Sequence, residues 1–204
     1  MEGINSQGFE KARHVKGSLF KEYVRMIKKN KRIDWSKYLS PSDMNFIKHG
    51  IITVVEWYPY ETLQNLGDAI FHEIAGEDTE VARSWGRKTM EGLADLYRKN
   101  LIEKGDQFQT LKKFINMYKH FFDFGGFELI VREENHVEIK VDQAFGEKGA
   151  KGYGYQMIGS FERLIELSGA DEVKAKFLKK AWEGARNTVI ELRWSDGNGG
   201  ELGP

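Results

Sequence analysis

The chain has 204 residues, of which 40% are hydrophobic, 30% charged and 13% aromatic, and its 31 acidic side chains balance its 31 basic ones. A chain of this length can bury a sizeable core, and its neutral charge gives no overall field that would attract nucleic acid. The absence of cysteine excludes disulfides, thiolate zinc sites, iron–sulfur clusters and cysteine nucleophiles. No apolar run approaches the roughly 18 residues that cross a bilayer, and residues 1–16 lack the apolar centre of a signal peptide, so we expect no transmembrane segment and a cytoplasmic location.

The first part of the chain has the pattern of packed helices. Apolar residues recur at three- and four-residue spacing from Gly17 to about Tyr118, which is the period of a helix with one buried face. Ser18 is expected to cap the first helix, and the last helix of this part is expected to include Phe122 and to end before Gly125. The predicted helices begin near Ser18, Pro41, Pro59, Asp78 and Phe108.

The second part has the pattern of strands. Apolar and charged residues alternate over residues 127–131, 137–141, 173–177 and 190–194, and a helical stripe over 157–167 separates the second run from the third. Alternation of this kind indicates an antiparallel sheet with one wet face. We therefore predict an α+β fold in which a helical part packs with a four-stranded antiparallel sheet in ββαββ order.

The domain organisation follows from these two patterns. We expect an N-terminal arm over residues 1–16 and a single domain over 17–194, with a helical part at 17–125 and the sheet with its helix at 126–194. The glycine-rich residues 195–204 are expected to form a flexible tail.

The sequence contains no complete catalytic or metal-binding motif. The stretch that begins at Gly152 lacks the third glycine of a dinucleotide-binding loop, and His72-Glu73 lacks the second histidine of a zinc protease. His120 and Asp123 could share a helix face as metal ligands, but two further ligands at suitable spacing are missing. We expect no catalytic residue and no metal site.

A further group of residues could serve either a pocket or a core. Aromatic residues from three successive helices, with a few polar tips, are what an apolar ligand pocket uses, and a helical core uses them equally. Gly86 within a helix indicates close approach of a backbone or a ligand. Arg87 beside it could hold a carboxylate or phosphate, or form a structural salt bridge.

Short motifs in a fixed order give the chain a family resemblance over about residues 16–194. It resembles an uncharacterised bacterial family of paralogous proteins and, more distantly, the haem nitric-oxide-binding and 4-vinyl reductase domains. The motifs are Lys16-Gly17-Ser18-Leu19-Phe20, Trp57-Tyr58-Pro59, Gly76-Glu77-Asp78, Trp85-Gly86-Arg87, Gly169-Ala170 and the terminal Trp194.

The resemblance implies a helical N-terminal part, a C-terminal antiparallel sheet, and a small-molecule pocket between them that serves sensing rather than catalysis. Haem-binding members carry a Tyr-x-Ser-x-Arg motif and zinc-binding members use cysteines, and this chain has neither. We therefore expect no cofactor, with haem possible but disfavoured.

The leading hypothesis is a non-enzymatic sensory domain with an apolar pocket for an unidentified small apolar ligand. One alternative is a protein-interaction or scaffold module with a closed core, and another is a haem-based sensor that acts through His72 or His120. A protein partner or a homodimer is possible, and no nucleic acid is expected. The predicted ligand-binding residues are Trp57, Tyr58, His72, Trp85, Arg87 and Tyr118.

Overall fold

The computed structural model describes residues 12–142, 145 and 150–196. Residues 1–11 of the predicted arm and residues 197–204 of the predicted tail lie outside the described residues. Within the described ranges, no helix is both long enough and apolar enough to cross a membrane.

The N-terminal part is a set of helices tied together by a short pair of strands. Strands β1 and β2 are antiparallel, with Val15 opposite Tyr58. The residues just before Gly17, assigned by the sequence to an arm, thus form a strand. The elements are β1 (His14–Lys16), α1 (Gly17–Lys29), a 3-10 turn (Trp35–Lys37), α2 (Pro41–His49), β2 (Trp57–Pro59) and α3 (Tyr60–Glu73).

The start of α1 differs from the prediction. Lys16, not Ser18, is the capping residue, and it makes no side-chain capping bond. The amide groups of Gly17 and Ser18 donate instead to the backbone carbonyls of Glu56 and Val54. Because a neighbouring loop satisfies these first-turn donors, the helix needs no capping hydroxyl.

Two more helices complete the helical part, α4 (Thr79–Leu101) and α5 (Gln107–Tyr118). Asp78 caps α4 as predicted, by accepting from the amides of Glu80 and Val81. The end of α5 comes earlier than predicted, because the backbone beyond it pairs with β1: Phe121 accepts from the Lys16 amide, and Phe122 bridges to Val15.

The C-terminal part is a four-stranded antiparallel sheet with a helix on its inner face. The strand order is β3-β4-β6-β5, and Ile139 of β4 lies opposite Ile190 of β6. Both residues are fully buried, as is Leu164 of α6. The prediction of a mixed helix-and-sheet fold with an antiparallel sheet is confirmed. The elements are β3 (Phe127–Glu133), β4 (His136–Val141), α6 (Ala150–Leu167), β5 (Ala170–Lys179) and β6 (Thr188–Asp196).

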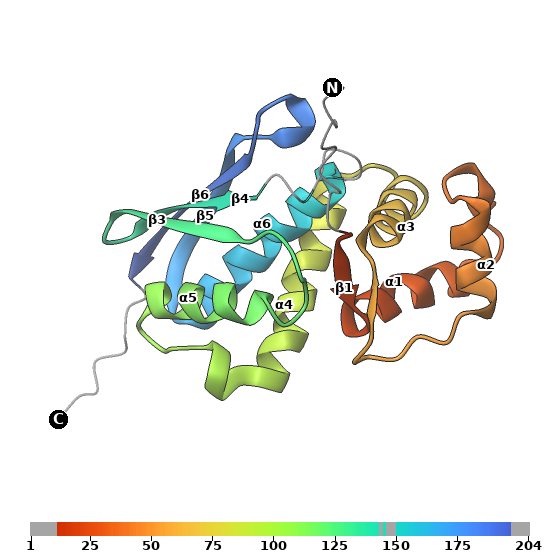
Figure 1. The fold of residues 1–204 in the computed structure, drawn as a ribbon. Coiled ribbons are helices and arrows are strands. Elements are labelled where there is room, and N and C mark those ends of the chain that lie inside the picture. Colours follow the sequence, from red (N-terminus) through yellow and green to blue (C-terminus); the bar gives the residue numbers. More distant parts are fainter. Residues whose placement is uncertain (1–11, 143–144, 146–149, 197–204) are drawn as a thin grey trace, which may run out of the picture.

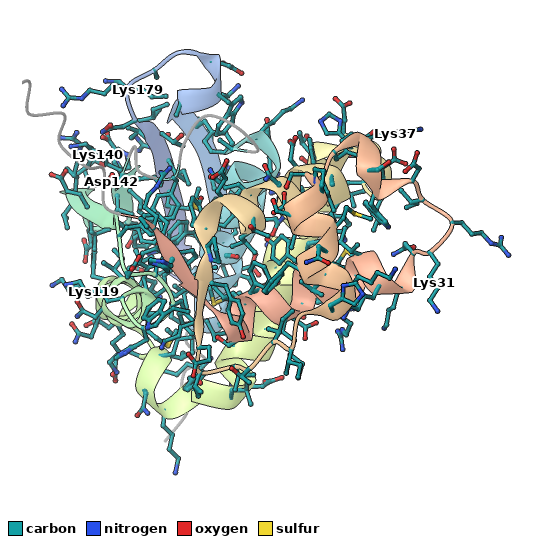
Figure 2. The ribbon with its side chains drawn as sticks, turned by 45° about the vertical axis from the view of Figure 1, so that its right-hand side comes forward. Lys31, Lys37, Lys119, Lys140, Asp142 and Lys179 are labelled. Carbon is teal, nitrogen blue, oxygen red and sulfur yellow. The ribbon has the colours of Figure 1, made fainter. Side chains whose placement is uncertain are left out.

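The parts form successive layers (Figure 1). The sheet lies on one side, α6 lies against it, α4 runs beside α6, and the β1–β2 pair with α1, α3 and α2 follows outward from α4. In Figure 2, Lys31 and Lys37 mark the outer edge of the N-terminal helices, and Lys140 and Lys179 mark the opposite side of the molecule.

The contact between α4 and α6 is unusually close. A methyl group added at Gly86 would overlap the backbone carbonyl of Gln156, and one added at Gly159 would overlap the carbonyl of Arg83. Ser160 Oγ donates to the Gly86 carbonyl at 3.0 Å. Glycine at both positions lets the two backbones touch. The sequence indicated close approach of a backbone or a ligand at Gly86, and the structure contains the approach of a backbone.

We expect Gly86→Ala to lower the free energy of unfolding by about 3 kcal/mol, because the new methyl must push two backbones apart. Gly92→Ala on the same helix is the matched control, since nothing lies within 4 Å of the added methyl. The control should be neutral or stabilising by up to about 1 kcal/mol. Urea unfolding of both variants measures the difference, and equal stabilities would contradict the close-contact explanation.

Candidate ligand-binding site

An apolar cavity of about 310 Å³ lies where the N-terminal helices meet α5, β3 and α6. This volume is at the lower end of the roughly 300–1,000 Å³ typical of small-molecule sites. Residues of five helices contribute to its wall. They are Ser18, Leu19, Glu22, Tyr23, Leu63, Gly86, Thr89, Met90, Leu93, Leu96, Phe114, Tyr118, Phe121, Phe122, Phe127, Tyr153, Gln156, Met157, Ser160 and Phe161.

The chemistry of this wall favours an apolar guest. Aromatic, leucine and methionine side chains make up most of it, and Glu22 is the one charged residue among those that line it. Among the residues that the structure describes, no histidine, lysine or arginine lines the cavity. A charged ligand would therefore have to keep its charged groups at the mouth of the cavity.

Tyr118 stands out among the residues that line the cavity. Its ring stacks on Phe122 at 4.4 Å between centroids and meets Phe127 edge-on at 4.6 Å. The residue is only 4% exposed, and its hydroxyl has no hydrogen-bond partner. An unpaired buried hydroxyl costs about 1–3 kcal/mol, and burial raises the pKa of Tyr118 far above its usual range.

Other tyrosines nearby have partners. Tyr23 Oη donates to Gln156 Oε1 at 3.2 Å, and burial raises the pKa of Tyr23 to about 12. Tyr60 Oη donates to the carbonyl of Phe145 at 3.1 Å. Among the buried tyrosine hydroxyls of the described residues, that of Tyr118 is the one without a partner.

Two of the predicted ligand-binding residues belong to β2 and do not line the cavity. Trp57 is 41% exposed, with Lys16 Nζ 3.9 Å from the centre of its ring. Tyr58 is buried, stacks on Phe20, and accepts from the Thr53 amide at 2.8 Å. Tyr58 thus holds the loop before β2 against α1, and Trp57 contacts β1 through Lys16.

Three other predicted residues also lie outside the cavity wall. His72 pairs with Glu77 at 2.8 Å at the surface and stacks on Tyr38. Trp85 packs half-buried against the core beside Arg87, which donates to Glu166 at 2.7 Å. The sequence left two roles open for Arg87, binding of a carboxylate or phosphate ligand and a structural salt bridge, and the structure contains the salt bridge.

The structure thus brings Tyr118 together with residues that the sequence analysis did not select. Residues of the wall that the sequence analysis missed come from α4, β3 and α6: Met90, Leu93, Phe127, Tyr153 and Met157. Their helical or alternating spacing showed that they face inward, but that spacing does not distinguish a filled core from a cavity.

The histidine and aspartate considered as metal ligands do not act as a pair. Asp123 contacts His14 instead, with Oδ2 2.8 Å from Nδ1. Over the described ranges, no group of three potential metal ligands is present.

A second, larger hollow lies at the end of the sheet. It has a volume of about 1010 Å³ and is a shallow groove lined by Lys140, Asp142, Lys179 and Arg186 among others. Lys140 is paired with Glu128 at 2.9 Å. The apolar cavity is the better candidate site, because small-molecule sites are concave and mostly apolar.

Solved structures share this fold at low sequence identity. An Fe(II) unliganded H-NOX protein from K. algicida is 11% identical, with a TM-score of 0.60 and coverage of 90% of this chain and 98% of that one. An H-NOX protein from S. oneidensis in the Fe(II)NO ligation state is 11% identical, with a TM-score of 0.58 and coverage of 89% and 99%. No protein-family model matches the sequence, and no curated protein matches it.

The chain therefore has an H-NOX-like fold, and the distant resemblance to that superfamily is confirmed. An oxygen-binding H-NOX domain related to soluble guanylate cyclases also shares the fold, with 11% identity, a TM-score of 0.56 and coverage of 89% and 96%.

The expectation of no cofactor is wrong. The structures that share the fold include iron-containing proteins, and one of them was determined to probe haem distortion in the H-NOX family. Haem is thus the cofactor to which the fold points. The expectation depended on the missing Tyr-x-Ser-x-Arg motif, which is a local sequence signature and not a property of the fold.

The ion pairs between α4 and α6 predict that the stability of the protein depends on pH. Burial alone would raise the pKa of Glu166, but hydrogen bonds from Arg87 and Arg163 outweigh it and hold the pKa below its usual value. A carboxylate with a lowered folded pKa stabilises the protein above its unfolded pKa of about 4.5, and that contribution is lost as the pH falls through the folded value.

We expect Glu166→Gln to lower the free energy of unfolding by about 1 kcal/mol at pH 7, and the difference from the parent protein to shrink toward zero near pH 3. Glu134→Gln in the β3–β4 turn is the control, because Glu134 is exposed. Urea unfolding across this pH range measures both variants. A pH-independent loss in Glu166→Gln would rule out the ion pair as its cause.

Proposed function

We propose that this protein is a non-enzymatic sensory domain that binds haem in the apolar cavity between its helices and its sheet. The observation that carries the proposal is the apolar cavity of about 310 Å³ in a fold shared with H-NOX proteins. The fold comparison favours the haem-based sensor over a sensor for an unspecified apolar ligand.

The residues that line the cavity suit a flat apolar guest. Phe114, Phe127 and Leu93 would pack against a macrocycle and exclude water from its faces. Haem would supply an iron centre that can take a small ligand. The described lining contains no lysine or arginine that could pair with the propionates and no histidine that could bind the iron, so it suits the apolar part of the haem only.

The positions of the two histidines give little support to the hypothesis that one of them binds the haem iron. His72 lies at the surface with Glu77, and His120 is exposed. Neither contributes to the wall of the cavity. Our proposal therefore keeps haem and gives up His72 and His120 as the groups that hold it.

The competing proposal is a protein-interaction module with a closed core. A cavity of about 310 Å³ argues against a closed core, since protein interiors contain few voids larger than a water molecule.

We expect the purified protein to bind haem with one-to-one stoichiometry and to develop a shifted Soret band on titration. Native mass spectrometry measures the stoichiometry independently of colour. A protein that stays colourless and retains no haem by either method would contradict the proposal and favour the interaction module.

Leu93→Trp should weaken haem binding at least 10-fold, because Leu93 lines the cavity and the larger ring would occupy part of it. Leu178→Trp on β5 is the matched control, since Leu178 is 43% exposed and lies outside the wall. Circular dichroism checks that both variants fold. Equal haem affinity in the two variants would place the binding site elsewhere.

A further inference from the structure

The segment that joins α2 to β2 carries exposed apolar side chains close together in the chain. Eight large hydrophobic residues are exposed over the described ranges, and half of them lie in residues 50–57: Ile51 at 87%, Val54 at 51%, Val55 at 69% and Trp57 at 41%. In Figure 1 this segment runs along the lower edge of the molecule, below α1. A group of exposed apolar residues marks a surface that contacts a protein or a membrane.

Specific contacts hold the backbone of this segment in place. Lys16 Nζ donates to the Val55 carbonyl at 2.8 Å and lies 3.9 Å from the centre of the Trp57 ring. The amide of Ser18 donates to the carbonyl of Val54. The apolar side chains are therefore presented to solvent by a backbone that is bonded to β1 and α1.

Basic side chains on α1 and α2 adjoin the segment. Gly17, where α1 begins, lies so close to Thr53 that an added methyl would overlap its carbonyl. Lys21 and Lys28 follow at helical spacing on the same face of α1 as Gly17, and both are exposed. Lys48 in the last turn of α2, just before the segment, is also exposed.

The composition of this surface favours a membrane over a protein partner. Protein interfaces are depleted in lysine, whereas an anionic lipid surface attracts it, and tryptophan is enriched where membranes meet water. Glu56 is the one acidic residue of the segment, against the four lysines in or beside it, and Glu22 on α1 is paired with Arg25. The local charge is therefore positive, although that of the whole chain is zero.

We infer that residues 50–57 and the adjoining basic face of α1 dock this protein on the surface of an anionic lipid bilayer. The aliphatic side chains and Trp57 would enter the boundary between headgroups and acyl chains, and the lysines would contact the headgroup phosphates. Contact of this kind places the protein on the membrane and not across it. The inference goes beyond the proposed function and does not depend on haem.

Flotation of the full chain with lipid vesicles tests the inference. The parent protein should float with vesicles that mix phosphatidylglycerol with phosphatidylcholine, and much less with phosphatidylcholine alone, which has no net charge. Val54→Ser/Val55→Ser should lower the partition coefficient about 10-fold, because less apolar surface enters the bilayer. Val131→Ser/Leu178→Ser on the sheet is the matched control, since these residues are 56% and 43% exposed, and it should bind as the parent does.

A second pair of variants tests the charge. Lys21→Gln/Lys28→Gln should weaken binding to the mixed vesicles, and the difference from the parent should shrink at high salt, which screens the attraction. Lys174→Gln/Lys179→Gln on β5 removes the same charge from another exposed surface and should leave binding unchanged. Circular dichroism checks that all variants fold.

A parent protein that floats with neither kind of vesicle would overturn the inference, and so would binding that the segment variants and their controls reduce equally. Sedimentation velocity tests for the other occupant. A parent dimer that Val54→Ser/Val55→Ser dissociates, without flotation of the parent, would identify a protein interface in place of a membrane contact. The vesicle assay uses no haem, so its failure and the failure of the proposed function are distinguishable.

Discussion

The close crossing of α4 and α6 fixes how the two parts of the molecule meet. Gly86 and Gly159 bring the two backbones into contact, since any side chain at either position would overlap a carbonyl of the other helix. Arg83 donates to the buried carboxylate of Glu162 beside this contact, through two of its guanidinium nitrogens. Breaking such a buried pair would leave an uncompensated charge, so the crossing is held by packing and by charge together.

The cavity follows from this constraint. Because α6 lies on the sheet and α4 is held against α6 by the glycine contact, the side chains beyond that contact must span the gap to α1 and α5. Met90, Leu93 and Met157 face that gap together with Phe114, and they leave about 310 Å³ unfilled.

The sequence predicted the elements better than the site. Periodicity located the helices and strands, and Gly86 correctly indicated a close backbone approach. The prediction of Ser18 as the cap of α1 was wrong, because the carbonyls of Glu56 and Val54, distant in sequence, accept from the first-turn amides. Of the six predicted site residues, only Tyr118 lines the cavity. Periodicity tells which residues face inward, whereas a cavity depends on distances between elements that are set by long-range packing.

The absence of a haem-clamping motif therefore has a narrower meaning than the sequence suggested. The chain shares its fold with H-NOX structures at 11–12% identity, so the layers can be kept while almost every side chain differs. Helix packing requires inward faces of suitable volume, and many sequences satisfy that requirement. Axial ligation, by contrast, requires one donor atom at one place. Among the described residues of the cavity wall, no histidine stands at such a place, so sharing the fold does not by itself supply the side chain that such ligation requires.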